Sequence, residues 1–304
     1  MIAFGVAIAE SEPYRLYAEP GIRLAAEPDS AIFPYAAVGT ICRSYNLLLD
    51  AAAAQEGLEA LVIVHPYAEI RDPEFCAKLR EALRDRSVAI IGAVGATGVR
   101  SIAWWEGAVY SGRVRHRYQE HGGGETAAYA WTEPGSAPRE VEALDGYLLV
   151  LSPWAVSNLR FDESLTLGQG YELDICLQAR GAGRKVVVAD LHIVHHRELE
   201  LVGDLDIWVE AHIRMAEKWN DEIGRSGKGV NWKQRARRAE AEREAARATA
   251  MSTALASDAR VLDLERALAD RTETLSWRIT APLRKLNRRL TDAVRGVRQR
   301  ERSP

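Results

Sequence analysis

The segment from Gly170 to Val188 constrains the fold most strongly, because it predicts a helix that leads directly into a strand. Glu172 and Asp174 fall in the first turn of that helix, where free backbone N–H groups and the helix dipole favour ionised carboxylates. Gly181 and Gly183 end the helix before the strand begins. Two residues apart, the carboxylates point to different sides, so one can face a cleft while the other binds a neighbouring group. Acidic N-terminal capping without chemistry is the alternative interpretation.

Short apolar runs alternate with helical patterns along the first 190 residues. Strands are predicted at 2–9, 61–64, 88–94 and 141–151, and helices within 34–54, from 72 to about 85, and from Ser152-Pro153 to about Asn158. This alternation predicts a parallel or mixed α/β sheet. Residues 111–138 are rich in Gly and Pro and lack apolar periodicity, so they are predicted to form a surface loop, either an acceptor-side lid or a plain insertion.

Composition excludes several classes of protein. With 304 residues, 47% hydrophobic and 27% charged, the chain can bury a sizeable core. A net charge of −3 argues against nucleic-acid binding by the whole chain. Its three cysteines lack metal or disulfide spacing, no run approaches the ~20 apolar residues of a membrane span, and Met1–Glu10 lacks the pattern of a signal peptide. A cytoplasmic location is therefore expected.

The composition changes after residues 224–229, which predicts a domain at 1–228 and a helical tail at 229–304. Residues 233–274 are rich in Ala, Glu and Arg, and they predict a long, solvent-exposed helix. Val261, Leu264, Leu268 and Leu275 follow approximate heptad spacing, with Arg271 interrupting it. The helix is either a short coiled coil that forms a homo-oligomer or a solvated helix.

The last 29 residues, 276–304, are strongly basic and carry an apolar complement that includes Trp277 and Leu283. Such a segment can lie on an anionic membrane, peripheral at the inner face, with each nearby cation contributing roughly 1 kcal/mol. A solvated or partner-packed tail is the alternative.

Several of these segments together resemble a known family. Residues 171–188, preceded by Asp145-Gly146-Tyr147 and followed by His195-His196, look like the C-terminal half of a bacterial family 2-like glycosyltransferase of GT-A type. Residues 38–46 and 61–65 are similar to that family's helix and strand leading to the nucleotide and metal site. Residues 90–98 with Trp104-Trp105 resemble a branch related to streptomycin-cluster proteins, and 276–284 resembles a tail found beside polysaccharide glycosyltransferases. The resemblance covers residues 1 to about 225.

That resemblance implies a fold and an activity. The fold is a GT-A-like, mostly parallel mixed sheet flanked by helices, with a C-terminal helical tail. The activity is transfer of a sugar from a nucleotide-sugar donor to a glycan, lipid-linked or small-molecule acceptor, with inversion by analogy. The matched positions are Glu172 as general base with Asp174 in support, Asp145 and Gly146 in the donor and acceptor pocket, and Arg43 and Asn46 at the nucleotide site.

The same resemblance implies Mg²⁺ or Mn²⁺, but one expected ligand is missing. Tyr67 stands where the family's strand-end aspartate is expected. Glu69 and His65 could replace that ligand, or Arg43 and neighbouring cations could neutralise the diphosphate without metal. An ordinary strand-to-loop exit is the plain interpretation of this segment. His195 or His196 matches a metal or diphosphate ligand, and adjacent positions on a strand point to opposite sides, so only one of them can face the site.

Two other functions are compatible with the sequence. The first is a binding or scaffold protein that keeps the fold without chemistry, as Tyr67 and the large tail suggest. The second is a metal-dependent phosphoester hydrolase using His65, Glu172, Asp174 and His196, whose spacing matches no established motif. The early acidic residue expected to hold the nucleobase has only a loose match, in Glu10-Ser11-Glu12. Donor, acceptor, linkage and oligomeric state do not follow from the sequence.

Overall fold

The computed structural model describes residues 1–118, 124–126, 138–165, 168–196, 204–219 and 230–273. The chain divides into two compact units, Met1–Ala254 and Leu255–Pro304. The predicted boundary between 228 and 229 stays a prediction. Among the helices in the described ranges, none combines the length and apolarity needed to cross a membrane.

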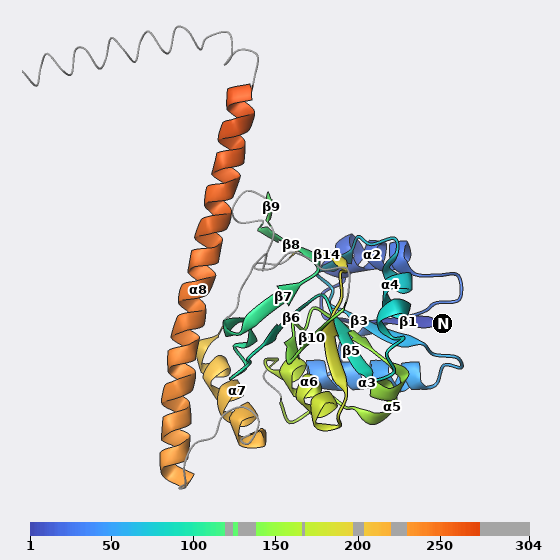
Figure 1. Cartoon of the computed structure of the whole chain (residues 1–304), viewed down its shortest axis with the longest axis horizontal. Helices are drawn as coiled ribbons and strands as arrows, with labels where there is room; N and C mark the ends of the chain where they lie inside the picture. The colour runs from blue at the N-terminus through green and yellow to red at the C-terminus, as the bar shows by residue number, and fades with distance from the viewer. Residues whose placement is uncertain (119–123, 127–137, 166–167, 197–203, 220–229, 274–304) are drawn as a thin grey trace, which may run out of the picture. The chain divides into compact units, whose positions relative to one another are not determined.

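A seven-stranded mixed sheet forms the centre of the first unit (Figure 1). Its order is β10-β13-β5-β12-β3-β1-β2. Five strands run in one direction, while β12 and β10 are antiparallel to their neighbours. The predicted mixed, mostly parallel α/β sheet is therefore confirmed. The strands are β1 (Ile2–Ile8), β2 (Ala31–Ala36), β3 (Ala60–Val64), β5 (Val88–Gly92), β10 (Arg139–Val141), β12 (Leu148–Leu151) and β13 (Lys185–Val188).

The inner strands are continuous apolar runs because both faces of the sheet are covered. Every residue of β3, β5 and β12 is buried. In Figure 1, α3 (Ile41–Ala53), α5 (Pro153–Asn158) and α6 (Tyr171–Gly181) lie on one face, and α2 (Glu19–Ala25) and α4 (Phe75–Ala82) lie on the other. Two-sided burial removes the alternation of a half-exposed strand and leaves β-branched and apolar residues throughout.

Sequence-local signals fix the ends of these helices. The Thr40 side chain caps α3 by accepting a hydrogen bond from the backbone N–H of Arg43, and Ser152 caps α5 in the same way with Ala155. The face of α3 that packs on the sheet buries Cys42, Tyr45, Leu48, Leu49 and Ala52. Two short elements, α1 (Ser11–Pro13) and η1 (Tyr14–Ala18), precede α2. All three cysteines are buried thiols that form no disulfide.

Two smaller sheets flank the main one, and they correct two predictions. One sheet contains β11 (Ala143–Leu144), β6 (Val94–Thr97) and β7 (Ala108–Ser111), and the other contains β4 (Ala68–Ile70), β14 (His192–His195), β8 (Arg113–Tyr118) and β9 (Gly124–Thr126). The predicted strand at 141–151 is therefore wrong as a single element, because the chain turns at Asp145-Gly146-Tyr147. The predicted loop at 111–138 contains β8 and β9, and residues 119–123 and 127–137 lie outside the described ranges.

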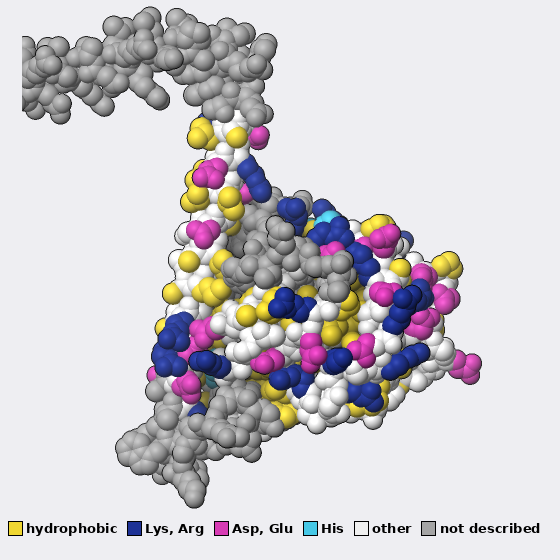
Figure 2. Space-filling model, viewed as in Figure 1, with side chains coloured by type: hydrophobic (Ala, Val, Ile, Leu, Met, Phe, Trp, Pro, Cys, Tyr) yellow, Lys and Arg dark blue, Asp and Glu magenta, His cyan; other side chains and the backbone are white. Residues whose placement is uncertain are grey.

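Helices α7 (Leu205–Lys218) and α8 (Val230–Glu273) follow the sheet. The long helix is confirmed, but its predicted exposure is wrong for the first unit, where Ala241, Ala245 and Ala248 are buried. In the second unit, Val261, Leu264 and Leu268 are more than half exposed, and Figure 2 shows hydrophobic side chains on the surface of α8. Leu275 and the basic tail from 276, with its predicted membrane contact, lie outside the described residues.

Candidate active site

A cavity of about 240 Å³ opens at the carboxyl ends of β1, β2 and β3. Ala9 and Glu10 line it after β1, Ala37 and Gly39 after β2, and residues 65–67 after β3. In the sheet, β1 lies between β2 on one side and β3 on the other, so the order of the strands reverses direction at β1. The cavity lies at this switch in strand order. Open α/β sheets bind ligands at this position.

The first turn of α3 forms another wall of the cavity through Thr40, Ile41, Ser44 and Tyr45. Gly39, just before the cap, has a φ of 64°, a left-handed conformation that glycine adopts without strain. The Ser44 hydroxyl accepts a hydrogen bond from Val38 N at 2.9 Å and so holds the turn in place. A helix start carries unpaired N–H groups and a partial positive charge, which suits an anionic ligand.

Aromatic rings build the opposite wall. Tyr67 donates a hydrogen bond from its hydroxyl to Glu10 Oε2 at 3.3 Å. Tyr17, on η1, stacks on Tyr67 with ring centroids 6.5 Å apart, and on His196 at 3.9 Å with an interplanar angle of 7°. Tyr67, which stands where an aspartate is expected, therefore orients a carboxylate instead of supplying one.

Asp145 and Glu172 form a pair of interacting acids that do not themselves line this cavity. They lie behind its lining residues, because Tyr45 packs on Tyr171 and His65 N donates to the Tyr147 carbonyl. Burial raises the pKa of Asp145 to about 7, although the Tyr147 N–H donates to its Oδ1 at 3.2 Å and favours the charged form. Burial raises the pKa of Glu172 to about 8, and the Asp145 charge adds to that effect. Glu172 Oε2 is shielded from solvent and has no hydrogen-bond partner among the described residues. Such an oxygen is suited to accept a proton from a bound ligand.

Two tyrosines connect the acids to the cavity. Tyr45 lines the cavity and packs edge-on against Tyr171, the first residue of α6, with centroids 5.7 Å apart. The Tyr171 hydroxyl donates to the Gly146 carbonyl at 3.4 Å. A Cβ at Gly146 would lie 2.4 Å from that hydroxyl, so glycine is required there by close packing. The start of α6, which carries Glu172, is therefore fixed against the Asp145-Gly146 turn.

Asp174 points to a different part of the molecule. Its side chain is fully buried, with Trp219 Nε1 at 2.8 Å and Lys218 Nζ at 2.6 Å from Oδ1. Gln178 Nε2 donates to Oδ2 at 2.7 Å. The carboxylate thus joins α6 to the end of α7. The two acids separate as their two-residue spacing predicts, and the catalytic support predicted for Asp174 stays a prediction.

Arg43 and Asn46 hold a neighbouring segment and do not line the cavity. Asn46 exchanges two hydrogen bonds of 2.9 Å with the backbone N–H and C=O of Phe161. Its amide also donates to Glu163 at 3.1 Å, and Arg43 Nη1 lies 3.4 Å from the same carboxylate. The nucleotide-site role given to this pair stays a prediction, and other residues of the same helix face the cavity.

The predicted metal ligands separate into two groups. His65 lines the cavity, its ring centroid lies 6.0 Å from that of His195, and His195 stacks on Tyr147 at 5.1 Å. His196 Nε2 and Glu69 Oε2 are instead hydrogen-bonded to each other at 2.6 Å.

Glu69 also forms an ion pair with Arg71 Nε at 3.1 Å. Burial works against the charged form of Glu69, but the hydrogen bonds from Arg71 and His196 outweigh it and lower its pKa. No three His, Cys, Asp or Glu side chains in the described ranges are grouped to hold a metal ion. The predicted ligands therefore do not fit a shared metal centre in the geometry described.

The sequence patterns predict no cavity role for Tyr17 or Tyr45, and Glu10 matches the expected acidic residue only loosely. Tyr45 had a usable signal, since it lies in the 38–46 segment that carried the family resemblance. Tyr17 had none, because it reaches the site through the packing of η1.

No family model matches the chain. The streptomycin biosynthesis protein StrF of Streptomyces griseus is 29% identical over 225 residues, which span 73% of this chain and 75% of that protein. The chain is a distant homologue of StrF, and its mixed α/β sheet is of the class that a GT-A-like fold requires.

Two solved structures are similar to this chain at low identity. The mannosyltransferase PcManGT of Pyrobaculum calidifontis, in complex with GDP-Man and Mn²⁺, is 13% identical, covers 91% of this chain and 81% of its own, and has a TM-score of 0.44. GalNAc-T7 with UDP, GalNAc and Mn²⁺ is 12% identical, with 73% of this chain and 48% of its own covered and a TM-score of 0.47. These likenesses concern the fold alone.

Proposed function

We propose that this protein is a glycosyltransferase that moves a sugar from a nucleotide-sugar donor to an acceptor hydroxyl. The observation that carries the proposal is the cavity at the ends of β1, β2 and β3 together with the acids Asp145 and Glu172, which Tyr45 and Tyr171 connect to it. The cavity offers a helix start for phosphates, and Glu10 and the tyrosines for the nucleoside.

Glu172 is the proposed general base. The acceptor oxygen attacks the anomeric carbon while its proton passes to Glu172 Oε2. The bond between the anomeric carbon and the diphosphate oxygen breaks, and its electron pair leaves with the diphosphate. A base with a pKa near the working pH transfers protons efficiently, contributing about 10²- to 10⁴-fold to the rate. A single displacement of this kind inverts the configuration.

The first turn of α3 is proposed to stabilise the departing diphosphate, and Asp145 to face the donor sugar. No step here depends on a metal ion, because the predicted ligands do not fit a shared centre. The acceptor class, the cytoplasmic location and a role in bacterial polysaccharide biosynthesis remain predictions.

A catalytically inactive binding protein is the second candidate. The observation that favours it is that Tyr67 replaces an expected metal ligand and that Glu69 and His196 bind each other. This candidate requires binding of a nucleotide sugar without transfer or hydrolysis.

The first test is a thermal-shift titration of the full chain with UDP-, GDP-, dTDP- and CMP-sugars, each with EDTA, Mg²⁺ or Mn²⁺. Selective stabilisation by one nucleotide class is expected, since ligands that bind the native state raise its stability. No response to any donor would contradict both candidates.

Turnover then separates the two candidates. Glu172→Gln is expected to lower turnover about 10²-fold or more while donor stabilisation is kept. Glu81→Gln, an exposed acid on α4, is the matched control with unchanged turnover. If Glu172→Gln transfers the sugar at the wild-type rate, Glu172 is not the general base.

A further inference from the structure

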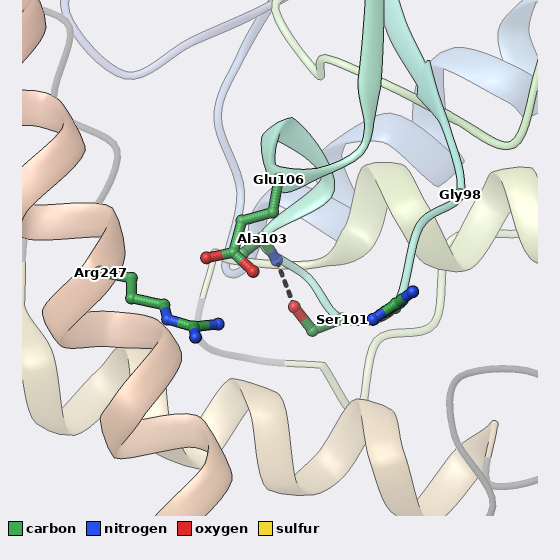
Figure 3. A pocket seen from close by; sticks show the side chains of 6 residues that line it. Gly98, Ser101, Ala103, Glu106 and Arg247 are labelled. Atoms are coloured by element: carbon green, nitrogen blue, oxygen red, sulfur yellow. Dashed lines mark hydrogen bonds between the residues drawn. The ribbon is translucent and has the colours of Figure 1, made fainter.

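A second cavity, of about 490 Å³, lies in the first unit between the segment that follows β6 and the helix α8. Figure 3 shows Glu106, at the end of η2 (Trp104–Glu106), and Arg247 of α8 turned toward the same space. The remaining lining residues are Gly98, Arg100, Ser101 and Ala103. Its volume is within the range of small-molecule sites. None of the predicted site residues lines it, and it shares no lining residue with the cavity at the ends of β1, β2 and β3.

The acidic part of this cavity is partly neutralised. Glu106 faces Glu244 of α8, which is only 5% exposed, and burial together with that neighbour raises the pKa of Glu106 to about 7. Glu244 Oε2 has no donor among the described residues, so a proton on Glu106 satisfies both carboxyl groups. The pair therefore keeps about one negative charge near neutral pH.

The guanidinium groups around the cavity outnumber the one negative charge that the Glu106–Glu244 pair keeps. Glu244 Oε1 accepts hydrogen bonds from Arg243 Nη2 at 2.8 Å and Arg247 Nη1 at 3.1 Å. Arg100 adds a third guanidinium to the region, and it has no acceptor among the described residues. Arg243 Nη2 also lies 3.8 Å from Glu240 Oε1, so the excess positive charge is that of the lining itself, where Arg100 and Arg247 stand against one carboxyl group, Glu106.

The lining also offers more donors than acceptors. Ser101 Oγ accepts a hydrogen bond from Ala103 N at 3.1 Å, as the dashed line in Figure 3 marks, and its hydroxyl proton remains to be donated. Arg100 and Arg247 are donors only, and their planar forks match the oxygens of a phosphate. A phosphate group is the ligand chemistry that this set recognises.

Ile102 connects this cavity to the proposed catalytic base. It lies between two lining residues, and a Cβ placed on Gly170 would be 3.2 Å from Ile102 Cγ2. Gly170 is the N-cap of α6, two residues before Glu172. Ile102 is buried and does not line the cavity, so one side chain separates a molecule bound there from the N-cap of the helix that carries the base.

We infer that this cavity binds a phosphate group on the acceptor, between Arg100 and Arg247, while the acceptor's hydroxyl reaches Glu172. The inference rests on the proposed function and names the acceptor class as phosphorylated. The phosphate belongs either to a soluble sugar phosphate or to a lipid headgroup, and the two probes in the test distinguish these sources.

Isothermal titration calorimetry of the full chain with glucose 6-phosphate, and with glucose as the neutral probe, tests whether the phosphate belongs to a soluble sugar phosphate. Vesicle co-sedimentation with and without phosphatidic acid tests the lipid source. Binding of one phosphate probe, at least about tenfold tighter than its neutral counterpart, is expected. Equal binding of charged and neutral probes in both assays would overturn the inference.

Variants assign the binding to this cavity. Arg100→Gln and Arg247→Gln are each expected to weaken phosphate binding about tenfold or more. Arg84→Gln, at an exposed arginine just after α4 that pairs with Glu81, is the matched control and is expected to bind as the wild type does. Arg247 also holds Glu244, so Arg100→Gln, which breaks no hydrogen bond in the described structure, is the decisive variant. Unchanged affinity in Arg100→Gln would contradict the site.

Donor titration in the same preparations separates the two proposals. Nucleotide-sugar stabilisation that persists in Arg100→Gln, while phosphate binding is lost, supports both. Donor stabilisation with no phosphate binding by the wild type overturns this inference alone. Phosphate binding without any donor response overturns the acceptor role along with the proposed function.

Discussion

Trp219 donates its indole N–H to the fully buried carboxylate of Asp174 at 2.8 Å, and this contact joins the end of α7 to the first turn of α6. The same oxygen pairs with Lys218 Nζ at 2.6 Å. Because α6 also carries Glu172, the contact fixes the helix that presents the proposed base.

Asp174→Asn is expected to destabilise the protein by about 3 kcal/mol, because it removes one charge of an ion pair whose carboxylate is fully buried. Urea unfolding measures this change. Asp50→Asn removes an exposed carboxylate 3.3 Å from Arg160, and its cost is expected to stay within about 0.5 kcal/mol. Equal effects of the two variants would contradict the structural role of Asp174.

Asp145→Asn is expected to shift the pH dependence of activity toward lower pH. The negative charge of Asp145 contributes to the raised pKa of Glu172, after burial, so its removal lowers that pKa. In the wild type, the rate rises as Glu172 loses its proton through a pH of about 8. The pH profile of kcat/KM measures the shift, and an unchanged midpoint in Asp145→Asn would show that the two acids act independently.

Glu106→Gln is expected to reduce the pH dependence of stability. The pKa of Glu106 is raised from 4.5 to about 7 in the folded protein, mainly by burial and then by Glu244, so the folded state binds this proton more tightly than the unfolded state. The resulting stabilisation is complete below pH 4.5 and is lost as the pH rises through about 7.

Chemical unfolding at pH 5 and pH 8 tests this sign. The wild type is expected to lose more stability between the two values than Glu106→Gln, whose amide donates to Glu244 at every pH. A pH response of Glu106→Gln as large as that of the wild type would exclude the shared proton.

Gly146→Ala is expected to destabilise the protein by about 1–3 kcal/mol, because its Cβ would lie 2.4 Å from the Tyr171 hydroxyl. Tyr171→Phe in the same chain removes that oxygen and is expected to restore part of the loss. Thermal unfolding of the two single variants and the double variant gives the coupling between them. If the effects of the two single variants simply add in the double variant, the Cβ at position 146 does not clash with the Tyr171 hydroxyl.

Much of the fold follows from local sequence. The apolar runs at 2–9 and 61–64 became β1 and β3, and the cap Ser152 with Pro153 started α5 where expected. These signals depend on neighbours in the chain, which a sequence displays directly. The strand predicted at 141–151 failed at a turn that has a local signal, because Asp145-Gly146 favours a turn and the Tyr147 N–H donates to Asp145 Oδ1 at 3.2 Å. The contact of the Tyr171 hydroxyl with the Gly146 carbonyl, which adds to that turn, joins residues 25 positions apart and is not visible in local patterns.

The candidate site divides in the same way. Helical geometry was enough to predict that Glu172 and Asp174 diverge, because the angle between positions two apart is set by the backbone alone. Sequence could not predict that His196 pairs with Glu69, or that Tyr67 orients Glu10, since these partners are separated by 127 and 57 positions. The sequence by itself determined the α/β class, the helix that presents two acids, and the long C-terminal helix. Only the tertiary structure decided which side chains share a cavity and which acids keep a proton, because burial and through-space charge depend on residues that folding brings together.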